Sequence, residues 1–332
     1  MPNFQDWSVG LAKESTFGTA VTPTRWLEFT EPKPFTIDRG IKQGAGLRPG
    51  SRVARAARRV KTIRQASGDI TVEAFSKGLG LLLEACMGSG VSTLVTAPTH
   101  QQVYSLADVL PSHTIQFGVP NSAGTIRPLT FSGCTVSAWE LGGAVGDIAT
   151  LKTTWDARNW TTATAYTSPS YPTGGNLFTV ESATINTGTV TMPTATALGS
   201  GGTPLAGVRD FKIAMSNAIV NDRFFMNNAG LKDQQLPGTR LPTVELNVEY
   251  KDNTLWDALE ANSDLSLVIT LVGPLGLGSE TLQVVIPDLE LDEGLPEGGP
   301  DAIASQAIKM VGLDNLTQAP IVMVSRTSDT AL

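Results

Sequence analysis

The sequence has few of the residues on which catalytic, metal-binding and disulfide-rich proteins depend. Its 332 residues include two cysteines, Cys86 and Cys134, and two histidines, His100 and His113. Two cysteines cannot build a disulfide framework, so we expect two buried free thiols. Two isolated histidines argue against a histidine-based metal site and against a Ser/His/Asp or Cys/His catalytic site. We therefore predict no metal and no cofactor.

Charge and long apolar runs are also scarce. Charged residues make up 17% of the chain, against about 25% in typical soluble domains. The net charge of −7 argues against a protein held to nucleic acid by phosphate contacts. No apolar run approaches the ~20 residues of a membrane helix, and the N-terminus has no basic region of a signal peptide. We expect no membrane contact and a low-charge surface that neighbouring molecules cover.

The residues that are present indicate a globular, strand-rich protein. Hydrophobic residues make up 41% of the chain, and 33 glycines and 20 prolines are scattered along it. This composition is typical of strands joined by turns, and the length suggests roughly two domains.

An internal repeat supports two domains. Residues 67–85 align without a gap on residues 243–261, and the matching positions include Asp69 with Glu245 and Glu73 with Glu249. In both segments an alternating strand pattern precedes leucines at helical spacing. The chain therefore predicts two copies of a strand-and-helix unit, and the alternative is that any two strand-rich segments look alike.

The repeat sets the expected domain organisation. We predict a mainly β protein of two tandem β-sandwich or barrel units, each with a short flanking α-helix. The first unit spans residues 1–159 and the second spans 206–316. Residues 160–205 form a Thr/Ser/Gly-rich linker or hairpin insertion. Residues 317–332 form a C-terminal strand and a polar tail that we expect to fray.

Two segments resemble ligand-binding motifs but lack residues that those motifs require. The glycines of residues 44–50 are not followed by a helix, so they do not form a phosphate-binding loop. The carboxylates of residues 288–301 lack the glycine and the final glutamate of a calcium loop. We expect a strand there, with Leu289 and Leu291 inward and the carboxylates outward.

The most unusual segment is the basic loop, residues 39–64. It holds nine of the 24 basic residues and no acidic residue. Without interleaved aromatic residues it does not resemble a base-stacking surface. Contact with an acidic surface on a neighbouring copy explains the charge best, and a solvated loop and nucleic-acid binding are the alternatives.

Several segments together resemble the tail tube protein (major tail protein) of long-tailed bacteriophages. The resemblance is carried by residues 10–29, by the basic stretch 52–60, and by residues 68–73 with 78–84. These motifs cover the first quarter of the chain, and the second half depends on the internal repeat.

The resemblance implies a structural, non-enzymatic virion protein that assembles in the host cytoplasm. Its β units are expected to form rings whose inner strands close into one barrel. The rings stack into the hollow tail tube that delivers phage DNA, which passes without specific binding. The expected partners are other copies of the chain and the tape-measure, tail terminator and distal tail or baseplate proteins. Because of the repeat we favour a ring of three chains with pseudo-sixfold symmetry over a ring of six.

Two sets of residues are the candidate functional sites. The acidic residues on the polar faces of the two repeated strands are expected to face the lumen: Asp69, Glu73, Glu245 and Glu249. The basic loop and the acidic strand are expected to bridge rings or subunits through Arg48, Arg52, Arg55, Arg58, Arg59, Arg64, Asp288, Glu290, Asp292, Glu293 and Glu297.

Two other functions are compatible with a strand-rich chain. Another ring-forming tail component, a terminator or baseplate hub, would form one ring and stop. A carbohydrate-active β protein is a weaker alternative, because aromatic residues make up 6% of the chain and no carboxylate pair stands out.

Overall fold

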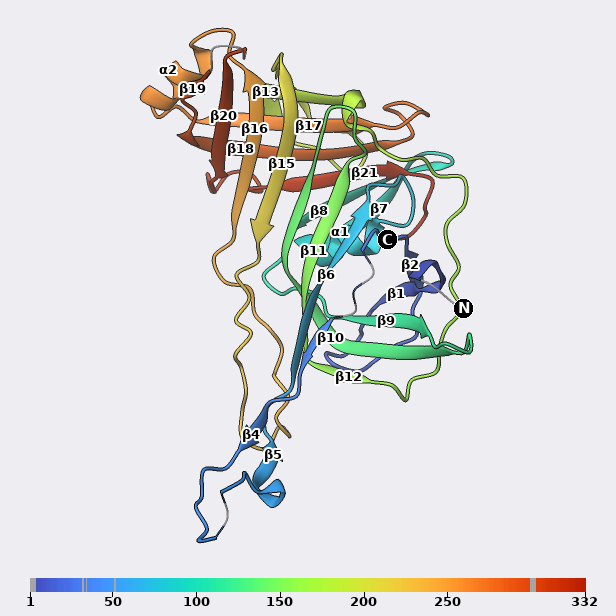
Figure 1. Cartoon of the computed structure of the whole chain (residues 1–332). Helices are drawn as coiled ribbons and strands as arrows, with labels where there is room; N and C mark the ends of the chain where they lie inside the picture. The colour runs from blue at the N-terminus through green and yellow to red at the C-terminus, as the bar shows by residue number, and fades with distance from the viewer. Residues whose placement is uncertain (1–3, 32, 34, 51, 299–302) are drawn as a thin grey trace.

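The computed structural model describes residues 4–31, 33, 35–50, 52–298 and 303–332. It is mainly β, as the sequence predicted, and its large sheets are antiparallel (Figure 1). The two predicted helices are α1 (Gly80–Met87) and α2 (Thr254–Glu260). Within the described residues, no helix is both long enough and apolar enough to span a bilayer.

The first half of the chain forms two sheets that share one long strand. Its strands are β1 (Ser8–Lys13), β2 (Arg25–Leu27), β3 (Thr36–Asp38), β6 (Gln65–Glu73), β9 (His113–Pro120), β10 (Ile126–Ala144), β11 (Thr150–Ala157) and β12 (Asn159–Thr161). The beginning of β10 belongs to the sheet β2–β1–β9–β10–β12. The end of β10 belongs to the sheet β3–β6–β11–β10.

The second half repeats this pairing order strand for strand. Its strands are β13 (Ala183–Thr191), β14 (Ser200–Pro204), β15 (Val208–Ser216), β16 (Leu241–Glu249), β17 (Leu265–Val272), β18 (Thr281–Glu293), β19 (Pro296–Glu297), β20 (Ser305–Gly312) and β21 (Val322–Thr327). One sheet runs β14–β13–β17–β18–β21, and the other runs β15–β16–β20–β18. The short strand β19 continues the β18 edge against β20.

The long strands of the two halves even bend at matching positions. The register of β10 against β11 shifts between Val136 and Ala138, and that of β18 against β20 shifts between Leu291 and Glu293. A β-bulge at such a point increases the local twist and lets one strand turn from one sheet into another. Each half is therefore a β-sandwich whose two sheets share a bent strand.

The two halves are joined edge to edge. Residues 138–144 of β10 pair with residues 210–216 of β15. This pairing produces one continuous sheet of eight strands in the order β3–β6–β11–β10–β15–β16–β20–β18. Among the described residues the chain of pairings does not close on itself, and the sheet has one free edge at β3 and another at β18 and β19.

A hairpin of the first half reinforces the second half. Strands β7 (Gly88–Thr96) and β8 (Thr99–Leu106) follow α1, and β8 pairs with β21. Helix α1 is buried along its whole length, whereas α2 has no fully buried residue. The first helix is therefore a core element and the second lies at the surface.

Two loops protrude from the sheet at equivalent places. The basic loop (residues 39–64) follows β3 and contains β4 (Ile41–Gln43) paired with β5 (Arg59–Lys61). The second loop (residues 217–240) follows β15, and Figure 1 shows the two loops extending together away from the sandwiches. The Arg64 amide donates to the Gly230 carbonyl at 2.8 Å, so the loops contact each other.

The polar C-terminal tail does not fray, contrary to the sequence-based prediction. Gly78 donates its amide to Asp329 Oδ2 at 2.7 Å, and Arg25 donates to the Leu332 carbonyl at 2.8 Å. The Leu332 side chain packs against the core. These contacts hold the tail beside α1. The start of the tail is also fixed, since the tail directly follows β21, and β21 is paired along its whole length.

Buried His113 gives the fold a measurable pH dependence. Its ring packs edge-on against Trp155 at 5.7 Å, and burial, then the charge of Lys13, lower its pKa to about 3. The ordinary value is 6.5, so the unfolded chain binds more protons between pH 6.5 and 3. The stability associated with neutral His113 is complete above pH 6.5 and is lost as the pH falls toward 3.

We therefore expect His113→Phe to flatten the dependence of unfolding free energy on pH in this window. The expected reduction in slope is up to about 1.4 kcal/mol per pH unit, the value for one proton. Urea unfolding at a series of pH values measures the slope, with His100→Phe as the control because His100 is not buried. An unchanged slope in His113→Phe would contradict the assignment.

Candidate functional site: a polar sheet face and a basic loop

The eight-strand sheet has one apolar and one polar face. Along β16, Val244, Leu246 and Val248 are buried, and the residues between them are partly exposed. The same alternation occurs in β6 and β20. Because directly paired residues project to the same side of a sheet, the polar residues of all these strands lie on one surface, which we call the polar face.

The four acidic residues that the sequence analysis placed on the polar sides of the repeated strands all lie on the polar face. Asp69 and Glu73 are on β6, and Glu245 and Glu249 are on β16. They are brought onto one surface because β11, β10 and β15 bridge the two strands in a continuous ladder. The structure thus joins residues that are 176 positions apart in sequence.

Cross-strand cations accompany these carboxylates. Lys152 Nζ lies 3.3 Å from Asp69 Oδ2, and Lys212 Nζ lies 2.9 Å from Glu245 Oε2. The hydrogen bond with Glu245 is the main cause of a raised pKa at Lys212. Both pairs are about half exposed, so each contributes little to stability.

Acidic residues nevertheless outnumber basic ones on the polar face. The six inner strands place on it the carboxylates Asp69, Glu73, Glu140, Asp210, Glu245 and Glu249, and the cations Lys152, Arg209, Lys212 and Lys309, of which Arg209 lies 4.0 Å from Glu249. The polar face therefore carries charges of both signs and a net negative charge, which repels polyanions rather than binding them.

The acidic strand of residues 288–297 lies at one free edge of the sheet. Leu289 and Leu291 are buried, which confirms the predicted inward side of the strand. Glu290 and Glu293 pair with β20 on the polar face, and Asp292 and Glu297 are exposed. Burial, and then the neighbouring Asp264, raise the pKa of Asp288.

The basic loop carries unpaired positive charge. Both of its strands are exposed along their whole length, and Leu47 is 98% exposed, so among the described residues the outer part of the loop is largely uncovered. Among the described residues, none of the basic side chains selected from residues 48–59 forms an ion pair: Arg48, Arg52, Arg55, Arg58 and Arg59. The sixth, Arg64, stacks over the Trp160 ring at 4.2 Å and anchors the base of the loop.

The basic loop and the acidic strand of residues 288–297 lie at opposite ends of the molecule. Figure 1 shows β4 and β5 at the lower end of the view, and β19 and α2 at the upper end. The two oppositely charged groups therefore do not meet within one chain.

A buried ion pair at the base of the second loop was not predicted from the sequence. Lys232 Nζ lies 2.6 Å and 2.7 Å from the two carboxylate oxygens of Asp156, and Gln235 Nε2 donates to Asp156 Oδ2 at 2.7 Å. Arg158 Nε donates to the Lys232 carbonyl at 3.0 Å. These bonds fasten the second loop to the first half. No local pattern around Lys232 distinguishes it from an exposed lysine.

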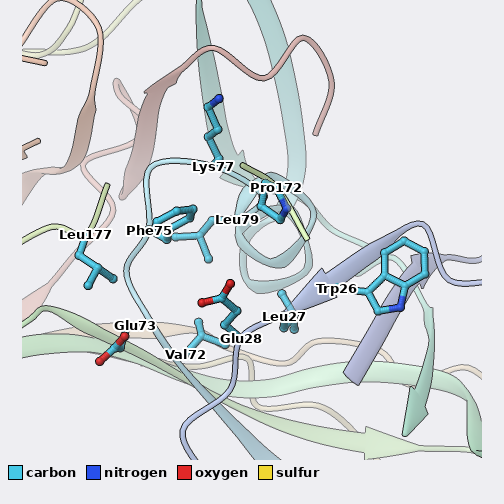
Figure 2. A pocket seen from close by; sticks show the side chains of 11 residues that line it. Trp26, Leu27, Glu28, Val72, Glu73, Phe75, Lys77, Leu79, Pro172 and Leu177 are labelled. Atoms are coloured by element: carbon cyan, nitrogen blue, oxygen red, sulfur yellow. The ribbon is translucent and has the colours of Figure 1, made fainter. Parts of the chain in front are cut away.

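Hollows of different sizes lie on the surface. The one between β2, β6 and the segment before α1 has a volume of about 40 Å³, below the roughly 300–1,000 Å³ of ordinary ligand sites, and a wider one of about 460 Å³ lies on the polar face beside Glu140 and Lys152. Figure 2 shows the Glu28 carboxylate among the side chains that line the smaller hollow and that of Glu73 turned away from it. The described residues also contain no cluster of three His, Cys, Asp or Glu side chains placed to hold a metal.

Comparison with known proteins identifies the family. No curated protein sequence matches the chain. The family model described as phage tail tube protein matches residues 5–314, which is nearly the whole chain. The chain therefore belongs to the phage tail tube protein family and is a structural component of a phage tail, not an enzyme.

Proposed function

We propose that this chain forms rings that stack into the hollow tube through which phage DNA reaches the host. The observation that carries the proposal is the eight-strand sheet, which is polar on one face and, in the part of the chain that the structure describes, open at both edges. Open edges expose unpaired backbone groups and are a hazard unless another chain pairs with them. A ring of identical chains pairs both of these edges at once.

We further propose that each chain supplies two of six equivalent ring positions. The two halves have the same pairing order, matching bulges and matching protruding loops, which supports two copies of one unit. Strands β13 and β14 occupy the places of β1 and β2, so we assign them to the second copy, which then begins near residue 183 rather than at 206. Three chains then give a ring of pseudo-sixfold symmetry, and six chains with one half outside are the alternative.

The polar face is proposed to line the lumen. Its net negative charge supports this orientation, since contacts attractive to phosphate hold DNA tightly and a repulsive surface lets it slide. DNA then passes without specific binding, and the apolar face of the sheet is covered by the rest of each sandwich.

Stacking of rings is assigned to the basic loop. The loop and the acidic strand lie at opposite ends of the molecule (Figure 1). Head-to-tail stacking therefore brings the arginines of one ring to residues 288–297 of the next, with complementary charge. The tape-measure, terminator and distal tail or baseplate proteins are proposed to meet the two ends of this stack, and assembly is proposed to occur in the host cytoplasm.

The stacking role predicts a loss of tube length without a loss of rings. The triple variant Arg55→Ala, Arg58→Ala, Arg59→Ala should form rings that stack poorly and separate at lower salt than wild-type tubes, because screening weakens the remaining attraction. Electron microscopy at increasing salt measures tube length. The control removes three exposed basic residues outside the loop: Lys33→Ala, Arg127→Ala and Lys251→Ala. Wild-type length and salt resistance in the loop variant would contradict the assignment.

Negative-stain electron microscopy across a concentration series tests the proposed function itself. Long hollow tubes with a regular axial repeat are expected. Discrete rings that never stack would instead favour a terminator or baseplate component, which is the second candidate function for a chain with this sheet.

A further inference from the structure

We propose that rings close through a specific antiparallel pairing in which Glu293, Gly294 and Leu295 of one chain lie opposite Asp38, Ile37 and Thr36 of the next. This seam deepens the proposed tube function and rests on it. The partner is a second copy of this chain, and the register is copied from a pairing that already exists inside the molecule.

The two edges involved are each paired on one side within the described residues. Strand β3 pairs with β6, and the end of β18 with β19 pairs with β20. Leu295, on the outer edge, is 64% exposed, and Thr36 and Asp38 are exposed. An exposed strand edge with an apolar residue is a surface ready to pair with another chain.

The junction of β10 with β15 is the template for the seam. There Ala138 lies opposite Ser216, Trp139 opposite Met215, and Glu140 opposite Ala214. The end of β18 occupies the place of the end of β10, and β3 occupies the place of β15. The two free edges of the sheet therefore correspond to the two strands that pair at the junction of β10 with β15.

The neighbouring ladders fix the correspondence residue by residue. Ala138 pairs through Thr154 to Asp69, and Glu293 pairs through Lys309 to Glu245, the residue that aligns with Asp69. Glu293 therefore corresponds to Ala138. Asp38 pairs with Gln65, and Ser216 pairs with Leu241. Gln65 and Leu241 each lie two positions before the aligned segments of the repeat, so Asp38 corresponds to Ser216.

The turns after β3 and β15 support the correspondence independently. The Gly40 amide donates to Asp38 Oδ1 at 2.8 Å, and the Ala218 amide donates to Ser216 Oγ at 3.1 Å. Both turn residues have positive φ, 53° at Gly40 and 46° at Ala218. A small polar side chain that caps a left-handed residue two positions later thus begins each protruding loop.

The proposed register also keeps the two faces of the sheet separate. Ile37 is partly buried against the core, and its partner Gly294 is buried, whereas Thr36 and Leu295 are both on the polar side. Because β3 is held by β6 and the end of β18 by β20, a slip of one residue would set side chains of the polar face opposite side chains of the apolar face. The ladder ends at Pro296, which has no N–H to donate.

Along the seam, one pair of opposite residues has charges of opposite sign and the next pair has charges of the same sign. In the template the Asn217 amide donates to the Ser137 carbonyl at 2.8 Å, so Arg39 of one chain lies opposite Asp292 of the next. Asp38 and Glu293 face each other, and Lys309 lies on the other side of Glu293. Lys309 and the incoming Arg39 offset the repulsion between the two carboxylates.

Cysteine cross-linking tests the register. The double variant Thr36→Cys, Leu295→Cys places two thiols directly opposite each other across the seam, where antiparallel Cα atoms lie about 4.5–5.5 Å apart and a disulfide fits. The control, Asp38→Cys with Glu297→Cys, uses exposed residues of the same strands four positions out of register, about 13 Å apart. Both native cysteines are buried, so background cross-linking is low.

The expected result is near-complete disulfide cross-linking of assembled Thr36→Cys, Leu295→Cys protein into closed covalent rings, and at least tenfold less for the control pair. Non-reducing gels show the products. Tubes that form normally without this cross-link, or that cross-link the control pair equally, would overturn the register and leave the tube function standing. Wild-type protein that never associates would remove both the seam and the tube proposal.

Discussion

Replacing Lys232 by Met is expected to lower the free energy of unfolding by about 3–5 kcal/mol, because it leaves Asp156 as an uncompensated buried charge. Both partners are almost fully buried, with side-chain exposures of 1% and 8%. Lys232 also fastens the second loop to the first half, so we expect the loop to detach before the sandwiches unfold. Chemical denaturation followed by tryptophan fluorescence measures the loss, since Trp155 precedes Asp156 on β11.

Two further variants separate the buried charge from other causes. Lys61→Met, at an exposed position in the basic loop, should change stability by less than about 0.5 kcal/mol. The double variant Lys232→Met, Asp156→Leu should recover much of the loss, because no charge is then buried alone. A cost below about 1 kcal/mol for Lys232→Met would show that water reaches the pair.

Reversing the four acidic residues of the polar face is expected to slow DNA ejection by about tenfold or more at low salt, while leaving tube assembly intact. The variant carries Asp69→Lys, Glu73→Lys, Glu245→Lys and Glu249→Lys. Each reversal adds two positive charges, so the formal net charge of a chain moves from −7 to +1. The reversed lumen binds phosphates, and salt should restore the rate because it competes for these contacts.

Ejection kinetics of particles assembled with the variant measure this effect, and a neutral variant is the control. Asp69→Asn, Glu73→Gln, Glu245→Gln and Glu249→Gln keep the side-chain shapes and remove the repulsion without adding attraction, so we expect little slowing. The loss of the ion pairs with Lys152, Arg209 and Lys212 should cost little stability, since all three pairs are about half exposed. Failure of the reversed variant to assemble would contradict the lumen placement.

The sequence predicted the repeated strands and helices because their signal is local. Alternation in residues 69–74 and 244–249 indicated strands, and leucines at helical spacing indicated the two helices. The polar side of the strands followed from the same alternation, which is why Asp69, Glu73, Glu245 and Glu249 were found together.

Features that depend on distant pairing could not be predicted in this way. The junction of β10 with β15 joins residues about 70 positions apart, and nothing local in either strand specifies its neighbour. The second loop was missed because its three basic and two acidic residues nearly balance, so it has no run of one charge like that of the basic loop. What the two loops share is the geometry of the turn at which they begin. Lys232 was missed because burial of a lysine is decided by its partner.

The number of chains in one ring tests the central claim most directly. End-on cryo-electron microscopy of assembled tubes, together with the mass of the ring trapped by Thr36→Cys, Leu295→Cys, gives this number. The account predicts three chains, about 105 kDa for a chain of 35.0 kDa, with both halves of every chain lining the lumen. A ring of six chains in which one half lines the lumen and the other lies outside would contradict it.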